Sequence, residues 1–102
     1  MTKTLAPALA GLILSAMPAS AALSGYYDSA EQIGVILASP QVADALRQVP
    51  VEKLEREGTT ADGLLEWEVE SRDCDLSVFL RAIPPAGVGK TSYEVASIGR
   101  CD

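Results

Sequence analysis

The sequence predicts an α+β domain in which one kinked N-terminal helix, or two short helices, packs on a four-stranded antiparallel meander with one disulfide. Three observations predict this class. Apolar residues recur at helical spacing between residues 30 and 48, strand-like alternation replaces that spacing after residue 50, and two cysteines bracket the last predicted hairpin. Helices followed by a run of strands are typical of an α+β fold.

The first 21 residues have the pattern of a cleaved secretory signal peptide. Lys3 precedes an apolar stretch over residues 5–17, and small residues at 19–21 suit a cleavage site. The stretch is 13 residues long, whereas a membrane-spanning helix needs about 20. We expect cleavage after residue 21, one small α+β domain over residues 22–102, and a periplasmic or secreted location without membrane insertion. The alternative interpretation of this stretch is an apolar core helix.

Two serines mark the expected helix starts. Ser29 and Gln32 have the spacing of a capping box, which predicts a helix over residues 30–38. The pair Ser39-Pro40 indicates a new start, with proline at the first helical position and a helix over residues 40–48. The apolar face that would cover the sheet consists of Ile33, Ile36, Leu37, Val42, Ala45, Leu46 and Val49.

The segment 64–71 is the clearest strand of the chain. Its residues alternate, with Leu65, Trp67 and Val69 on one face and Glu66, Glu68 and Glu70 on the other. A tight turn at 72–73 would place Trp67 opposite Val78 on the next strand. Residues 51–57 form a weaker strand candidate, which a turn over 58–63 joins to the first.

Residues 74–83 and 91–101 predict the last hairpin. When Cys74 is paired with Cys101, the apolar residues share one face and two charge pairs, Asp75–Arg100 and Arg81–Glu94, face each other on the other. The same register places Phe79 and Ile98 on the outer face together with the charges. One register thus satisfies the cysteines, the apolar face and the charges.

The loop of this hairpin, PPAGVGKT at residues 84–91, resembles the end of a phosphate-binding loop. That motif requires a glycine where Pro84 stands, and the prolines offer no backbone N–H to a phosphate. The residues that follow also read as a strand rather than a helix. We therefore interpret the segment as a hairpin loop, with Lys90 exposed at its base.

Cys74 and Cys101 are predicted to form a structural disulfide, because they are an even pair in an oxidising compartment and lack C-x-x-C spacing. The bond would close a loop of 28 residues and stabilise the domain by roughly 3.5 kcal/mol in the chain-entropy model. Two cysteines without a histidine do not supply the ligands of a zinc site.

The residue inventory argues against catalysis. The absence of histidine removes Ser-His and Cys-His nucleophilic pairs. A Ser–Lys pair and a two-carboxylate hydrolase stay open by inventory, yet no motif supports either and a domain this small has little room for a cleft. No D-x-D-x-D-G run predicts a calcium loop. We expect no enzymatic activity, and no catalytic, metal-binding or cofactor-binding residue.

Charge narrows the class of partner. Removing Lys3 with the signal peptide leaves 7 basic and 14 acidic residues, a net charge of −7. Nucleic acid is therefore an unfavourable partner, because phosphate contacts need lysine and arginine. The strongest cluster is the acidic row, defined as Glu66, Glu68 and Glu70, with Glu55, Glu57 and Asp75 expected nearby. The row is either a docking face for a basic or envelope protein or a solvated face that keeps the protein soluble.

Phe79 and Ile98 form a second candidate partner surface, because two outward apolar side chains framed by acids would mark an interface. The alternative is that both are covered or harmlessly scattered.

These observations favour a small exported, non-enzymatic protein-binding or accessory module. The alternative is an inhibitor of a secreted basic hydrolase that docks through the acidic sheet face, and a small enzyme is the third interpretation. The order of helix and strands is similar to cystatin-like folds. Since no motif of those proteins is present, the likeness of architecture implies nothing about function.

Overall fold

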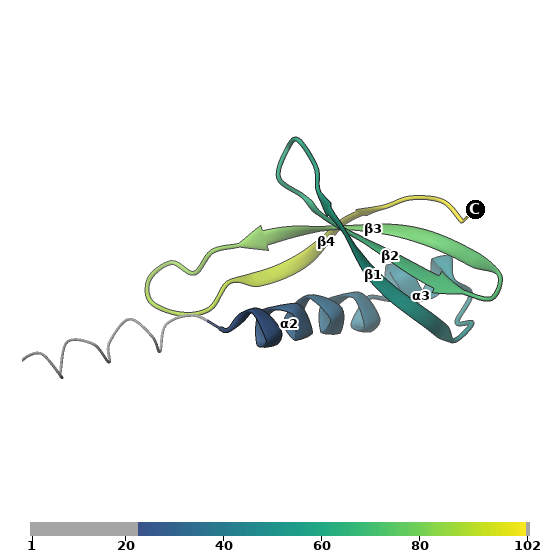
Figure 1. The fold of residues 1–102 in the computed structure, drawn as a ribbon, viewed down its shortest axis with the longest axis horizontal. Helices are drawn as coiled ribbons and strands as arrows, with labels where there is room; N and C mark the ends of the chain where they lie inside the picture. The colour runs from purple at the N-terminus through teal and green to yellow at the C-terminus, as the bar shows by residue number, and fades with distance from the viewer. Residues whose placement is uncertain (1–22, 102) are drawn as a thin grey trace, which may run out of the picture.

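The computed structural model describes residues 23–101 and has the predicted α+β architecture. Two helices, α2 (Gly25–Ala38) and α3 (Pro40–Ala45), precede four strands: β1 (Val51–Thr59), β2 (Leu65–Ser71), β3 (Cys74–Ile83) and β4 (Ser92–Ile98). The strands form one antiparallel sheet in the order β1-β2-β3-β4, and both helices lie on the same side of it (Figure 1). The predicted signal peptide, residues 1–21, lies outside the described residues. No helix within residues 23–101 has the length and apolar character needed to cross a membrane.

Helix α2 begins earlier than predicted. Ser24, not Ser29, is its N-cap, and the Ser24 hydroxyl accepts a hydrogen bond from the backbone N–H of Tyr27. The predicted capping box at Ser29 and Gln32 is therefore wrong. Gln32 is instead buried against the sheet, 7% exposed, because it lies on the same helix face as Ile36.

The sequence left open whether this region is one kinked helix or two short ones. The structure has two separate helices. Ser39 has an extended backbone between them, and its hydroxyl caps α3 by accepting from the N–H of Val42, with Pro40 at the start as predicted. Helix α3 ends at Ala45, short of the predicted residue 48. Arg47 and Gln48 adopt left-handed backbone angles, with φ of 55° and 59°, and so cannot continue the helix.

The sheet confirms most of the predicted pairing. Trp67 lies opposite Val78, and Arg81 lies opposite Glu94, where the two side chains form an ion pair of 2.9 Å. The second predicted charge pair, Asp75–Arg100, does not form among the described residues, because β4 ends at Ile98, before Arg100 reaches the ladder. Strand β1 is longer than the predicted 51–57 and carries two irregularities in its register with β2.

A bulge changes the register of the last hairpin. Leu80 pairs with Val95 as predicted, but Phe79 pairs with Ser97, so Ala96 is an extra residue on β4. Beyond the bulge, the residue opposite Val78 is Ile98, whereas the predicted register placed Ser97 there. The predicted outward position of Ile98 is therefore wrong: the side chain is half-buried and packs against the core.

The core lies between the helices and one face of the sheet. Five of its side chains are fully buried: Ile36, Val69, Leu76, Val78 and Leu80. A chain of hydrogen bonds crosses the same interface. The indole N–H of Trp67 donates to Gln32 (2.9 Å), the Gln32 amide donates to Asp28 (3.1 Å), and the Tyr93 hydroxyl donates to both Asp28 oxygens (2.8 and 2.9 Å). These bonds fix α2 over β2 and β4 and satisfy the polar groups buried there.

The predicted disulfide is present. Cys74, at the start of β3, is bonded to Cys101, which follows β4, with their Cα atoms 4.8 Å apart. The bond ties the C-terminal segment to the sheet, next to the turn that joins β2 and β3.

Candidate functional site

The acidic row occupies the side of the sheet opposite the helices. Its three glutamates alternate along β2 with Trp67 and Val69, which are buried in the core, so the glutamates point away from the helices. All three are half-buried rather than free in solvent, because strands flank β2 on both sides. The alternation predicted from sequence is thus confirmed, and the row is part of a sheet face that neither α2 nor α3 covers (Figure 1).

Neighbouring strands add further carboxylates to this face. Glu55 on β1 lies directly opposite Glu68, and Asp75 on β3 lies opposite Glu70. Glu57 stands at the irregularity of β1 and adds its charge near Glu68. Like charges placed opposite one another destabilise a sheet. The three acids expected beside the row are therefore next to it, and the fold tolerates their repulsion.

Repulsion within this acidic face is visible in the pKa of Glu68. The pKa is raised above its ordinary value of 4.5, first by a hydrogen bond with Glu70, then by desolvation and by the charges of Glu70, Glu57 and Asp75. A proton or another cation near Glu68 would relieve this repulsion.

Lys53 is the cation in contact with the row. Its ammonium lies 3.4 Å from a carboxylate oxygen of Glu55 and 3.8 Å from one of Glu70. The charge of Glu55, followed by its hydrogen bond and the charge of Glu70, raises the pKa of Lys53. Ligand oxygens of Glu55, Glu68 and Glu70 lie within 4.8 Å of one another and are of the type that Ca²⁺ prefers. Because the Lys53 ammonium already contacts two of the three, we assign no metal here.

Phe79 lies beside the row as predicted, whereas Ile98 does not. Phe79 is half-buried on the outer face, directly opposite Glu66. Ile98 is on the helix side of the sheet because of the bulge. The structure therefore does not bring the two residues together into one apolar patch, and Phe79 belongs with the acidic face.

The loop over residues 84–91 is exposed along nearly its whole length and joins two strands. Lys90 is exposed as predicted, and its ammonium forms an ion pair of 2.9 Å with Glu31 of α2. The loop is therefore pinned beside the helix, and the glycine-lysine pair sits before a strand, not before the helix that a phosphate-binding loop requires.

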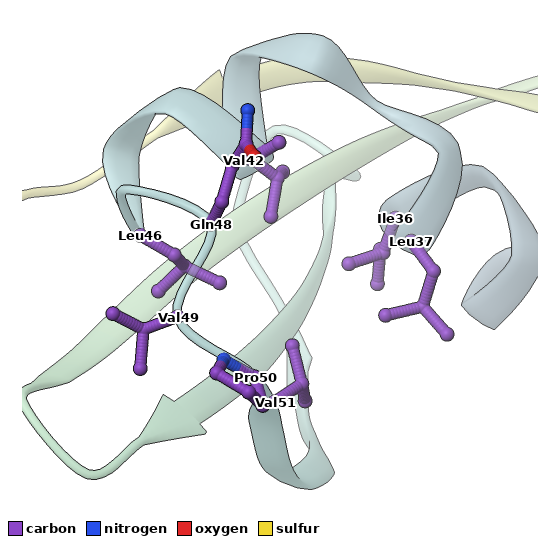
Figure 2. Close-up of a pocket in the computed structure, with 9 residues that line it drawn as sticks. Ile36, Leu37, Val42, Leu46, Gln48, Val49, Pro50 and Val51 are labelled. Atoms are coloured by element: carbon purple, nitrogen blue, oxygen red, sulfur yellow. The ribbon is translucent and has the colours of Figure 1, made fainter.

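An apolar pocket on the helix side of the sheet was not predicted. It has a volume of about 300 Å³ and lies between the C-terminal end of α2, helix α3 and the connection to β1. Figure 2 shows Ile36 and Leu37 on one side and Val42, Leu46, Val49, Pro50 and Val51 on the other. Ala43 and Gln48 complete the lining, and Gln48 is its one polar side chain.

The pocket exists because of the turn that follows α3. Arg47 and Gln48 are both left-handed, which costs non-glycine residues roughly 1–2 kcal/mol each. The turn reverses the chain so that residues 49–51 face α2 across the pocket. Leu37 is left 54% exposed at the rim. The sequence did not predict the pocket. Leu37 and Val49 fit an ordinary apolar helix face, and the residue types at positions 47 and 48 do not indicate a left-handed backbone.

Comparison with known proteins identifies no relative: no protein-family model, no curated protein and no solved structure matches this chain.

Proposed function

We propose that this chain is a small exported, non-enzymatic protein-binding module that docks a basic protein through the outer face of its sheet. The observation that carries the proposal is the gathering of six carboxylates on a sheet face that neither helix covers, with Lys53 in contact with two of them. The six are Glu55, Glu57, Glu66, Glu68, Glu70 and Asp75.

Electrostatics supports a basic partner. A hydrogen bond with Glu70 and desolvation raise the pKa of Glu68 most, and the charges of Glu70, Glu57 and Asp75 add to this; lysine or arginine brought to this face would offset the repulsion between these charges. Complementary charge also speeds encounter and selects orientation. Each exposed ion pair contributes only about 0–1 kcal/mol, so the acidic face sets rate and orientation more than it sets affinity.

Export is supported by the disulfide between Cys74 and Cys101, since such bonds persist in oxidising compartments, and by the signal-peptide pattern of residues 1–21. The absence of histidine, and the position of the acidic residues on an open sheet face, favour binding over catalysis.

The test is a crosslinking capture from periplasmic extract with oxidised residues 22–102. The variant Glu66→Lys, Glu68→Lys, Glu70→Lys reverses the row. A matched control, Asp44→Lys, Asp62→Lys, Asp73→Lys, makes the same change of net charge at exposed positions on α3 and in two turns. We expect one basic protein to be captured by the unaltered chain and by the control, and to be lost with the row reversal. Capture that survives the row reversal, or no basic protein captured at all, would refute the proposal.

The captured protein also separates an accessory module from an inhibitor. It is purified and titrated with the chain at two salt concentrations. If it is a hydrolase whose activity falls to zero at a 1:1 ratio, and the inhibition weakens with salt, the module is the inhibitor. If it has no hydrolase activity, or keeps that activity when saturated, the module is an accessory protein.

A further inference from the structure

The pocket lies at the start of an edge strand. Val51 is the first residue of β1 and also lines the pocket. Strand β1 is at the end of the sheet order and pairs with β2 alone, so one row of its backbone N–H and C=O groups faces no strand among the described residues. The two irregularities and the charged side chains of β1 protect parts of this edge, so the regular stretch that an added strand could pair with is residues 53–56.

The pocket has ample room for an aromatic side chain. Its volume of about 300 Å³ is at the bottom of the range of about 300–1,000 Å³ for small-molecule sites. Its apolar lining would remove an aliphatic or aromatic side chain from water, and the exposed Leu37 forms a rim that such a side chain would cover. The pocket is half-open to solvent, and Ile36 is fully buried beneath it.

Charge defines the other face of an added strand. Side chains of successive residues in a strand point to opposite faces. A strand beside β1 that directs one residue to the helix side, into the pocket, directs the residues one and three positions away to the outer face. The first outward side chain of β1 after Val51 is Lys53, because residue 52 is the extra residue of an irregularity, and Glu55 is the next. A peptide residue one position from the pocket would therefore lie beside Lys53, and lysine or arginine fits the position three away, beside Glu55.

We propose that the partner is held as an extended peptide segment that pairs with the free edge of β1, inserts one aliphatic or aromatic side chain into the pocket, and places basic residues beside the acidic face. This inference rests on the proposed function and deepens it. It supplies the affinity that exposed ion pairs lack, because backbone pairing and one buried apolar side chain accompany the charges. Recognition then requires an apolar residue with a basic residue three positions away.

The probe is a fluorescent nine-residue peptide with a central phenylalanine, one lysine three positions to either side of it, and threonine elsewhere. Three control peptides replace phenylalanine with alanine, move it by one position onto the lysine face, or N-methylate alternate backbone amides. Fluorescence anisotropy with oxidised residues 22–102 should show the first peptide binding about tenfold to a hundredfold more tightly than the alanine peptide. The shifted and N-methylated peptides should also bind more weakly.

Two protein variants test the pocket itself. Leu37→Lys changes an exposed rim residue, so the fold should survive, and Ala43→Leu fills the pocket from α3. Both should remove the preference for phenylalanine. The matched control Val88→Lys makes the same apolar-to-lysine change at a position that is 88% exposed in the hairpin loop, and should leave the preference intact.

The outcomes separate this inference from the proposed function. Equal binding of the phenylalanine and alanine peptides, or a preference that persists in both Leu37→Lys and Ala43→Leu, would overturn the pocket-and-edge inference. The proposed function falls separately, if row reversal leaves capture of the basic protein unchanged. Sedimentation at rising concentration adds one further outcome: a dimer that Leu37→Lys dissociates would show a second copy of the chain in the pocket and would also overturn the inference.

Discussion

Replacing Gln32 with leucine isolates the hydrogen bond that links helix to sheet. The Gln32 side-chain oxygen accepts from the indole N–H of Trp67 at 2.9 Å, and both residues are buried, at 7% and 6% exposure. Leucine is close to glutamine in size but offers no acceptor. The Trp67 N–H would then be left in the core without a partner, while Asp28 would keep its bonds from Tyr93.

A buried donor left without an acceptor costs about 1–3 kcal/mol. In a domain of this size 1 kcal/mol corresponds to about 4–8 °C in melting temperature, so Gln32→Leu should lower the melting temperature by at least about 4 °C. Trp67→Phe removes the donor. In that background Gln32→Leu should cost only about 0.5 kcal/mol or less, which gives a coupling free energy of about 0.5 kcal/mol or more between positions 32 and 67.

The assay is urea denaturation of the oxidised chain followed by far-ultraviolet circular dichroism, because Trp67→Phe removes the single tryptophan. Gln41→Leu, at an exposed position on α3, is the control for the chemical change alone and should alter the free energy of unfolding little. If Gln32→Leu destabilises the protein equally with Trp67 and with phenylalanine at position 67, the bond does not connect helix to sheet and the reasoning is refuted.

Three further predictions concern stability. Replacing Cys74 and Cys101 with serine should lower the free energy of unfolding by about 3.5 kcal/mol in urea titrations, and unchanged stability would contradict the loop-closure argument. Glu68→Gln should stabilise the protein at pH 7, because the raised pKa of Glu68 in the folded state makes its ionised form unfavourable there. The gain in stability should shrink as the pH falls through that pKa towards 4.5, where the carboxyl is protonated in the folded protein. A gain that does not change with pH would contradict this prediction. Tyr93→Phe, which removes the hydroxyl bonded to Asp28, should cost about 1–2 kcal/mol in thermal melts; no loss would show that this bond contributes nothing.

The sequence alone determined the elements that follow from local chemistry. Strict alternation specified the β2 face, because a one-residue slip would exchange Trp67 with its glutamate neighbours. The Ser39-Pro40 start also held, since both residues act on the adjacent backbone. The positions of Cys74 and Cys101 at the two ends of a hairpin were enough to predict the disulfide, because a hairpin brings its two ends together.

The same local signals failed where distant residues compete. Ser29 and Gln32 have the spacing of a capping box. In the structure, however, the Gln32 side chain accepts a hydrogen bond from the buried indole of Trp67, 35 positions away in the chain, and does not cap the helix. The sequence pattern did not predict the bulge at Ala96, because β4 alternates acceptably both with and without it. The bulge places Ile98 against the core, and that core is complete only when the helices pack on the sheet.

What the sequence by itself determined is therefore the α+β class, most of the strand register, the disulfide and the acidic row. Only the tertiary structure decided that Lys53 bridges Glu55 and Glu70, and that Leu37 and Val51 share a pocket at a free sheet edge. The physical reason is range. Alternation and capping act over a few residues, whereas a pocket depends on where a left-handed turn at residues 47–48 places one element against another.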